Sequence, residues 1–308
     1  MFRIPLILPA VFATIAVALT VPQPTLDAST SAASAARQAG GRERVLYASV
    51  VDKNGEPVTG LGADDFIVRE DNVRREVLRV SPAVEPMALA ILVDNSAAAE
   101  DDIRNIREGL TTFVQQMRTG HDIAIIGLAD RPTILQDYTR NGELLQAAIG
   151  RLFAQPGSGM MLLDTIVEVS RGLSKRDEPR ANIVAILTDG TEFSTLHYTQ
   201  VLEPLRGSGA ALHALAIGTF ASSMRDELRN RAVVLDLGPR RTGGQRQTLL
   251  SSMAVPGALE RLGRELSNQY KVVYGRPEAL IQPETTTVDV TRPGLTARGT
   301  PERRKPGA

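Results

Sequence analysis

Residues 87–96 read MALAILVDNS, an unbroken run of apolar side chains that ends in polar residues, the first of which is Asp94. A second run of the same kind, residues 182–187 (NIVAIL), is followed by a threonine and then by Asp189. Apolar runs of this length are typical of strands buried on both faces of a parallel sheet, and open α/β sheets bind ligands just past the carboxyl ends of their strands. We therefore expect Asp94 and Asp189 to face one shared cleft.

Helical and strand patterns alternate around these two runs. Apolar residues at three- and four-residue spacing predict helices, and short apolar runs predict strands. Helices are expected at residues 100–117, 143–153, 161–173, 198–205 and 256–267, and further strands at residues 122–130, 132–139 and 211–218. Residues 219–246 are less regular, with a turn at Gly243 and Gly244 before a last short strand. Because parallel neighbours need crossover connections, this order predicts an α/β fold with a doubly wound, mostly parallel sheet.

The two motifs LVDNS and ILTDG, about ninety residues apart, resemble those of a von Willebrand factor type A (VWFA) domain. That family has a metal-ion-dependent adhesion site made of Asp-x-Ser-x-Ser after the first strand, a Thr in a Gly-rich loop and an Asp after the fourth strand. The resemblance assigns Asp94, Ser96 and Asp189 as metal ligands here. The second Ser of the pattern falls on Ala98, and the Thr falls on Met160 in the loop GSGMMLLDTI.

This departure from the family pattern predicts a degenerate site with weak or absent Mg²⁺ binding, about millimolar or worse. Mg²⁺ prefers six oxygen ligands in octahedral geometry, whereas Ala98 offers no oxygen and the thioether of Met160 is a poor ligand for a hard cation. Asp94 and Asp189 repel each other when both are ionised, so we expect a cation, a proton or a basic side chain of a partner to relieve that repulsion. Substitute hydroxyl ligands are available at Ser158, Thr188 and Thr191.

Residues 1–21 have the pattern of a secretory signal peptide, in which Arg3 precedes an uncharged stretch and Ala-Val-Ala at 16–18 offers a small-x-small cleavage motif. An uncleaved membrane anchor is the alternative, since about eighteen apolar residues just span a bilayer. In either case the rest of the chain is expected outside the cytoplasm, periplasmic or secreted. Residues 22–43 have too little apolar surface to fold and are predicted to be a flexible linker.

The segments on both sides of the α/β pattern have β character. Residues 45–51 predict one strand, residues 64–80 two strands around a turn, and residues 285–294 alternate apolar and polar side chains. We expect both flanks to pair into one small β module, with two unrelated β flanks as the alternative. The predicted organisation is a signal peptide (1–21), a linker (22–43), a β flank (44–83), a type A-like domain (84–271), a second β flank (272–299) and a disordered tail (300–308). The flanks also resemble those of VWFA-related proteins exported by some bacteria.

Composition excludes several functions. Lys+Arg and Asp+Glu balance at 35 each, so no net field steers the chain toward nucleic acid or an anionic membrane. The absence of Cys excludes disulfides and thiolate catalysis. A haloacid-dehalogenase-type phosphatase needs a second carboxylate at the position of Ser96, a response-regulator receiver needs an early acidic pair beside its phosphoacceptor, and the Gly-x-Ser-x-Gly nucleophile motif is absent.

Other polar residues carry weaker signals. His121, His197 and His213 lack zinc-type spacing; His213 is interpreted as a core side chain with satisfied hydrogen bonds, and His197 as a surface residue near the cleft. We interpret six arginines as part of a solvated face or, alternatively, as a patch for an anionic partner: Arg225, Arg229, Arg231, Arg240, Arg241 and Arg246.

The sequence therefore predicts an exported, non-enzymatic module that binds a protein ligand, with no nucleic-acid partner and no membrane contact beyond the export signal. By resemblance, type A domains recognise protein ligands at the carboxyl-end rim of their sheet, often with a magnesium ion completed by a carboxylate of the ligand. The alternatives are a metal-independent scaffold of an envelope complex and a metal-dependent hydrolase that uses Asp94 and Asp189.

Overall fold

The computed structural model describes residues 41–218, 225–277, 281 and 283–300. The predicted signal peptide, almost all of the linker and most of the tail lie outside the described residues. Strand β1 (Gly41–Val51) begins inside the segment 22–43 that was predicted as a linker, and as a whole it lies between two other strands of its sheet. Among the described residues, no helix combines the length and apolarity needed to cross a membrane.

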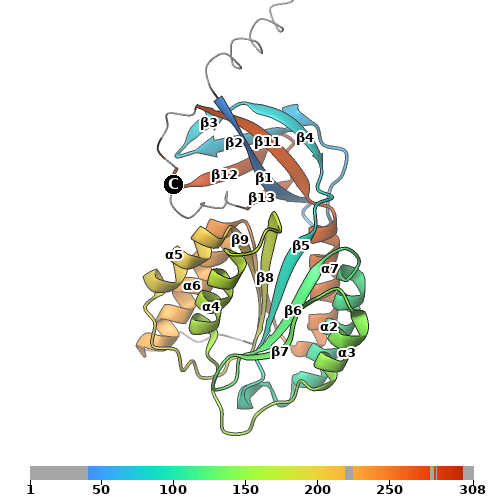
Figure 1. The fold of residues 1–308 in the computed structure, drawn as a ribbon, viewed down its shortest axis with the longest axis vertical. Coiled ribbons are helices and arrows are strands. Elements are labelled where there is room, and N and C mark those ends of the chain that lie inside the picture. The colour runs from blue at the N-terminus through green and yellow to red at the C-terminus, as the bar shows by residue number, and fades with distance from the viewer. Residues whose placement is uncertain (1–40, 219–224, 278–280, 282, 301–308) are drawn as a thin grey trace, which may run out of the picture. The chain divides into compact units, whose positions relative to one another are not determined.

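The predicted α/β sheet is present and has six strands in the order β10-β9-β8-β5-β6-β7 (Figure 1). All neighbours are parallel except β6 and β7, so the edge strand β7 is antiparallel. The strands are β5 (Met87–Val93), β6 (Asp122–Gly127), β7 (Thr133–Thr139), β8 (Arg180–Leu187), β9 (Ala210–Ile217) and β10 (Arg246–Leu249). Strands β5, β8 and β9 are buried along their whole length, which explains why their sequences are mostly apolar; the exceptions are Arg180 and Asn182 in β8 and His213 in β9. The doubly wound, mostly parallel sheet is thus confirmed.

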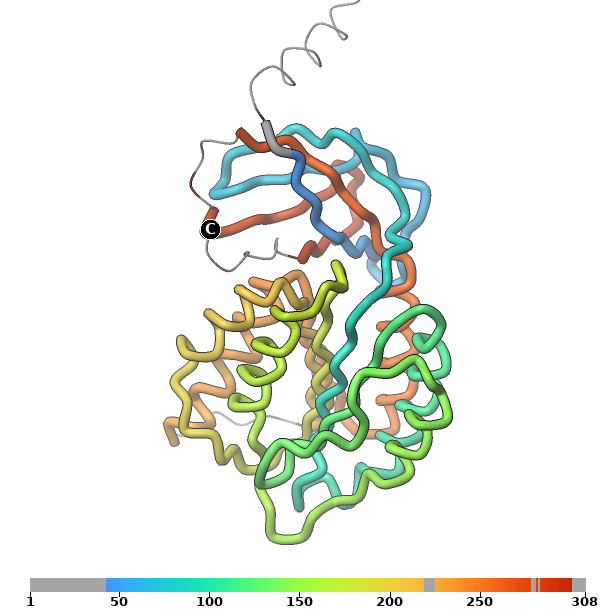
Figure 2. Tube along the Cα trace, in the orientation of Figure 1, coloured from blue at the N-terminus to red at the C-terminus, as the bar shows by residue number. Residues whose placement is uncertain are grey.

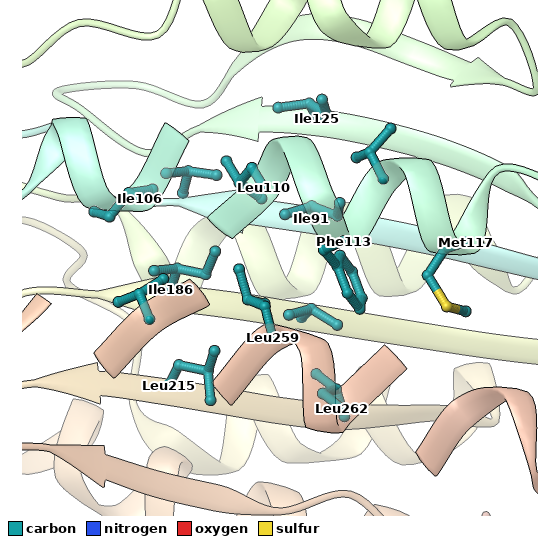
Figure 3. Close-up of a cluster of buried hydrophobic side chains, with 14 of the residues drawn as sticks. Ile91, Ile106, Leu110, Phe113, Met117, Ile125, Ile186, Leu215, Leu259 and Leu262 are labelled. Carbon is teal, nitrogen blue, oxygen red and sulfur yellow. The ribbon is translucent and has the colours of Figure 1, made fainter. Parts of the chain in front are cut away.

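Helices cover both faces of this sheet (Figure 1). One layer consists of α2 (Ile103–Met117), α3 (Gly142–Gly150) and α7 (Val255–Ser267), and the other of α4 (Leu162–Leu173), α5 (Tyr198–Ser208) and α6 (Asp226–Thr242). Figure 3 shows the core under the first layer, where Phe113 of α2 and Leu259 of α7 pack against Ile91 of β5. Each fully buried side chain of this size stabilises the fold by roughly 1.5–3 kcal/mol.

Helix α6 corrects the sequence interpretation, which found residues 219–246 less regular. Its buried positions, including Arg231, Val234 and Leu235, follow helical spacing, but one is an arginine and Pro239 lies in the last turn, so the apolar stripe is weak. The helix ends at Gly243, whose φ of 76° suits glycine and where a Cβ would overlap the carbonyl oxygen of Gly299.

The two flanks form one β module, as predicted (Figure 2). One sheet has the order β13-β1-β11-β4 and the other the order β12-β2-β3. Their strands, besides β1, are β2 (Phe66–Glu70), β3 (Val73–Arg75), β4 (Val77–Pro82), β11 (Tyr270–Pro277), β12 (Thr286–Val290) and β13 (Thr296–Gly299). Residues 64–80 were expected to form two strands, and this was wrong: the chain breaks at Glu76 because β3 pairs with β2 whereas β4 moves to the other sheet and pairs with β11. The described residues also include three short 3-10 helices: η1 (Ala63–Asp65), η2 (Ala97–Ala99) and η3 (Ser252–Ala254).

Arg180, at the start of β8, holds the two segments that connect the central sheet to the β module. Its side chain is buried and donates hydrogen bonds to the carbonyl oxygens of Ala83 (3.3 Å) and Glu85 (3.0 Å) on the entering segment. It also donates to the carbonyl oxygen of Leu266 (2.6 Å) and to Oε1 of Gln269 (2.9 Å) on the leaving segment. One guanidinium therefore ties both connections to the amino end of a central strand.

Candidate functional site

The two predicted carboxylates lie at the same end of the sheet. Asp94 directly follows β5, and Asp189 follows β8 after one residue. The two strands are parallel neighbours with Val93 opposite Ile186, and the backbone N–H of Asp94 donates a 2.8 Å hydrogen bond to the Ile186 carbonyl. We call this edge the rim; it consists of the loops at the carboxyl ends of the parallel strands, together with the segment 154–161.

Asp94 is fully buried, and both of its carboxylate oxygens accept hydrogen bonds from protein donors. Oδ1 accepts from the backbone N–H of Ser96 (2.9 Å), and Oδ2 accepts from the backbone N–H of Thr188 (3.1 Å) and from the Thr188 hydroxyl. Hydrogen bonds to a charged group contribute roughly 1.5–3 kcal/mol each. Asp94 therefore ties the turn after β5 to the end of β8.

The other positions of the adhesion-site pattern meet at Gly190. A Cβ built on Gly190 would lie 3.0 Å from the Ser96 hydroxyl, 3.1 Å from the Ala98 methyl group and 3.4 Å from the terminal methyl group of Met160. Met160 is fixed there by its backbone N–H, which donates to the Thr191 carbonyl (2.8 Å). In the described part of the chain, the buried Ser96 hydroxyl has no hydrogen-bond partner. The positions of the adhesion-site pattern therefore lie close together in the fold, but Ala98 places a methyl group and Met160 a thioether where the family has hydroxyl groups.

Arg231 of α6 supplies a positive charge at this point of the rim. Its side chain is only 2 % exposed. Nη1 donates a 2.6 Å hydrogen bond to the Gly190 carbonyl, and Nη2 lies 3.7 Å from Oδ1 of Asp189. Burial lowers the pKa of Arg231, while Glu192, Asp189 and Asp94 act in the opposite direction. A guanidinium stays protonated in proteins, so a fixed cation lies beside three carboxylates.

Glu192 is the third of these carboxylates and is also buried. Its Oε1 accepts hydrogen bonds from the backbone N–H groups of Leu162 (3.0 Å) and Ser194 (3.2 Å), whereas Oε2 has no partner among the described residues. Burial raises the pKa of Glu192 to about 7, although the Ser194 hydrogen bonds and Arg231 oppose the shift. Glu192 joins the loop after β8 to the start of α4 and titrates close to neutral pH.

These residues do not fit a magnesium ion. Both oxygens of Asp94 are engaged by protein donors, and the cationic guanidinium of Arg231 lies beside Asp189, where a second cation is repelled. Two of the suggested substitute ligands are also engaged: the Thr188 hydroxyl donates to Asp94, and the Ser158 hydroxyl donates to the Gln155 carbonyl (2.7 Å). Within the described ranges, no group of three or more His, Cys, Asp or Glu side chains is placed to hold a metal.

The three histidines lie in three different parts of the fold. His121 accepts a hydrogen bond from the backbone N–H of Met87, at the amino end of β5, the opposite end of the sheet from Asp94. His213 is buried in β9 as predicted, but neither ring nitrogen has a hydrogen-bond partner in the described structure, so the expected satisfied core histidine was wrong. Burial lowers the pKa of His213 to about 4 and keeps it neutral at pH 7. His197 is exposed at the start of α5 and contacts the Thr199 hydroxyl (2.9 Å).

Sequence reasoning missed Arg231 as a residue of the site. Five of the six arginines of residues 225–246 are exposed, as expected of a solvated face, but Arg231 is buried. The signal was present in the helical spacing of Arg231 with Val234, Leu235 and Gly238, which puts an arginine in the buried stripe of a helix. A charged residue at such a position is buried only with a partner.

Comparison with protein-family models agrees with this architecture. Residues 89–192 match the family model of the von Willebrand factor type A domain, and no curated protein sequence matches the chain. Among solved structures, the conserved hypothetical protein BatB from Bacteroides thetaiotaomicron is similar at 12 % identity, covering 59 % of this chain and 97 % of that chain, with a TM-score of 0.45. The vWF domain of the type V pili tip protein Mfa5 from Porphyromonas gingivalis is similar at 10 % identity, 60 % and 96 % coverage and a TM-score of 0.46.

The pilus adhesin SpaC from Lactobacillus rhamnosus GG, in its open conformation, is similar at 11 % identity, with 83 % of this chain and 49 % of that chain covered and a TM-score of 0.48. At these identities, the likeness to solved structures concerns the fold alone.

Proposed function

We propose that this chain, which contains a von Willebrand factor type A domain, is an exported, non-enzymatic module that binds a protein ligand at its rim without a bound metal. The observation that carries the proposal is the position of Arg231, buried beside Asp189 and hydrogen-bonded to Gly190. A cation supplied by the chain itself offsets the charge of the rim carboxylates, which removes the need for a metal to do so.

Two further observations support parts of this proposal. The pattern of residues 1–21 supports export. Non-enzymatic function is supported by the engagement of both carboxylate oxygens of Asp94 in hydrogen bonds from the protein itself, which leaves neither oxygen unengaged for a reacting group.

The test is capture of partners from an envelope extract on the immobilised exported chain, with and without a chelator. The rim variant is Leu250→Asp, and its matched control is Val84→Asp; these apolar side chains are 93 % and 85 % exposed, so neither change disturbs the core. Leu250 directly follows β10 at the rim, whereas Val84 lies in the segment that enters the sheet at the opposite end.

We expect one and the same partner with and without chelator, retained by the Val84 variant and lost by the Leu250 variant. Loss of binding in chelator would contradict the metal-independent rim. A partner held equally by both variants would move binding away from the rim and favour the structural scaffold of an envelope complex.

A further inference from the structure

We infer that the cavity lined by α6, β2, β12 and β13 is a binding site for a small sugar-like molecule that carries an oxyanion, either a phosphate or a carboxylate. The cavity has a volume of about 490 Å³, which is within the range of small-molecule sites. In its wall, a Cβ on Gly244 would lie 1.9 Å from the carbonyl oxygen of Leu212, close to the amino end of β9. The cavity is therefore at the opposite end of the parallel sheet from the rim, and the inference goes beyond the proposed function.

The charged residues that line the cavity are mostly cations. They are three arginines and one carboxylate: Arg69 of β2, Arg240 of α6, Arg298 of β13 and Asp289 of β12. A guanidinium group donates two parallel hydrogen bonds to a carboxylate or a phosphate. The excess of arginines over acids in the lining therefore favours an oxyanion as the ligand.

The ion pairs that two of these arginines form within the protein are exposed. The side chains of Arg69 and Asp289, 2.9 Å apart, are 37 % and 61 % exposed, and those of Arg240 and its partner Asp236 are 67 % and 58 % exposed. Exposed ion pairs contribute little to stability, so an incoming oxyanion shares or replaces these carboxylates at small cost. Arg298, by contrast, is paired with a buried carboxylate, that of Glu265 (2.8 Å), and remains a fixed cation of the wall.

A pair of like charges beside the cavity is a second reason to expect an anion. Strands β2 and β3 are antiparallel neighbours in which Arg69 is directly opposite Arg74, so both side chains belong to the same face of the sheet. Like charges that are directly opposite on paired strands destabilise the sheet. An oxyanion bound at Arg69 lowers this repulsion. The pairing register shows this independently of the cavity and its lining.

The uncharged residues of the lining indicate the rest of the ligand. Thr286, Thr287 and Asn72 have hydroxyl and amide groups, which hydrogen-bond to the hydroxyl groups of a ligand. The apolar side chains, Val288 and Ala297, are small, and no described residue of the lining is aromatic. This lining disfavours a nucleobase, which binds by stacking on aromatic rings, and suits a sugar.

The walls of the cavity are fixed by the fold. A Cβ on Gly243 would lie 1.8 Å from the carbonyl oxygen of Gly299, so the end of α6 is in direct backbone contact with β13. Asn72 has a φ of 66° in the turn after β2, and the neighbouring Asp71 carboxylate accepts a hydrogen bond from the N–H of Thr285 (2.8 Å) just before β12. A preformed site pays a smaller entropy cost on binding.

The test uses four probes: glucose 6-phosphate, glucuronate, glucose and inorganic phosphate. Each is titrated into the isotope-labelled exported chain at pH 7.5 and low salt. The backbone amide shifts of Thr287 and Gly243 are followed by NMR, and Gly190 at the rim is the internal control. We expect glucose 6-phosphate to bind most tightly and glucuronate next, with glucose and inorganic phosphate each about tenfold weaker than glucose 6-phosphate. About 500 mM NaCl should weaken the binding of both charged sugars.

Variants of exposed side chains assign the contacts. Arg69→Gln and Arg240→Gln should each weaken glucose 6-phosphate binding about tenfold. The matched control is Arg229→Gln, which alters another exposed, ion-paired arginine of α6 and should leave the affinity unchanged. Asp236→Asn releases Arg240 from its partner and should tighten binding about twofold to threefold. The opposite effects of the Arg240 and Asp236 variants separate a role in binding from a role in folding.

The inference would be overturned if neither charged sugar shifted the Thr287 and Gly243 amides up to about 20 mM, the limit of weak binding. It would also be overturned if glucose or inorganic phosphate bound as tightly as glucose 6-phosphate, or if Arg69→Gln and Arg240→Gln left the affinity unchanged. Each of these results leaves the proposed function standing, because the capture experiment tests the rim with Leu250→Asp and changes no residue of this cavity.

Discussion

Arg231 Nη1 donates a 2.6 Å hydrogen bond to the carbonyl oxygen of Gly190, which lies next to Asp189 in the loop after β8. The contact fixes a guanidinium beside carboxylates that lie on two different loops, those of Asp94 and Asp189. A metal ion occupies such a site only to the extent that its concentration allows, whereas a side chain of the chain is always present. The charge balance of this rim is therefore a property of the fold.

Replacing Arg231 with Gln should destabilise the protein by about 2–4 kcal/mol, because the Gly190 carbonyl loses its donor and the buried carboxylates lose their cation. Urea unfolding measures this difference. The matched control is Arg229→Gln on the same helix, where the arginine and its partner Asp226 are 63 % and 82 % exposed, and we expect a change within about 0.5 kcal/mol. Equal stability of the two variants would show that Arg231 has no role in holding the rim.

Magnesium should stabilise the unaltered protein by less than about 1 kcal/mol at concentrations near a millimolar dissociation constant. Thermal unfolding with and without magnesium measures the shift. Ala98→Ser with Met160→Thr restores the oxygens of the family pattern, and adding Arg231→Gln removes the competing cation; the triple variant should therefore bind magnesium more tightly than the double variant. A shift of many degrees at micromolar magnesium in the unaltered protein, abolished by Asp94→Ala, would contradict this prediction.

The central sheet was predictable because its strands are buried on both faces, and burial on both faces leaves an unmistakable apolar run in the sequence. The place of Asp94 and Asp189 followed from the same signal, since parallel neighbours end at one edge. The pairing of the two β flanks rested on alternating patterns alone, and the interruption at Glu76 left no comparable signal because the chain changes sheets there without a glycine or proline.

The cation of the site was not predictable in the same way. Arg231 occupies a position that a helical stripe normally gives to an apolar residue, so this arginine itself obscured the stripe of α6. Local sequence reasoning also cannot tell which of six nearby arginines is buried, because the answer depends on Gly190 and Asp189, about forty residues away in the chain. Tertiary contacts decided between a solvated face and a buried ion pair.

Arg180→Gln should weaken the fold by about 3 kcal/mol or more, because the four hydrogen bonds of Arg180 join the entering and leaving segments of the central sheet. Urea unfolding provides the measurement. Arg176→Gln, which alters a partly exposed arginine paired with Glu178, is the control and should change stability by less than about 1 kcal/mol. A similar small effect for both changes would show that the two connecting segments do not depend on Arg180.

Export should depend on residues 1–21. Replacing Arg3 and placing charges within residues 4–21 should leave the protein in the cytoplasm, because a signal peptide needs a positive start and an uncharged apolar stretch. Cell fractionation with N-terminal sequencing measures the location and the cleavage point. Charges placed in residues 22–35 serve as the control and should leave export intact. Recovery of the unaltered protein from the cytoplasm with Met1 attached would contradict the prediction.

Glu192 should make stability fall as pH rises toward neutrality. Its pKa is about 7 in the folded protein, whereas a glutamate in an unfolded chain has a pKa of about 4.3. Between these values the folded state holds one proton more than the unfolded state, so unfolding releases a proton and stability decreases with pH, by on the order of 3 kcal/mol in total and with no further loss above about pH 8.

Glu192→Gln retains an oxygen for the N–H groups of Leu162 and Ser194 but does not ionise. Urea unfolding from pH 5 to 8 should therefore show the Gln variant gaining stability relative to the unaltered protein, while the exposed control Glu260→Gln shows no such trend. A constant difference between the Glu192 variant and the unaltered protein across this range would mean that Glu192 is already ionised at pH 5.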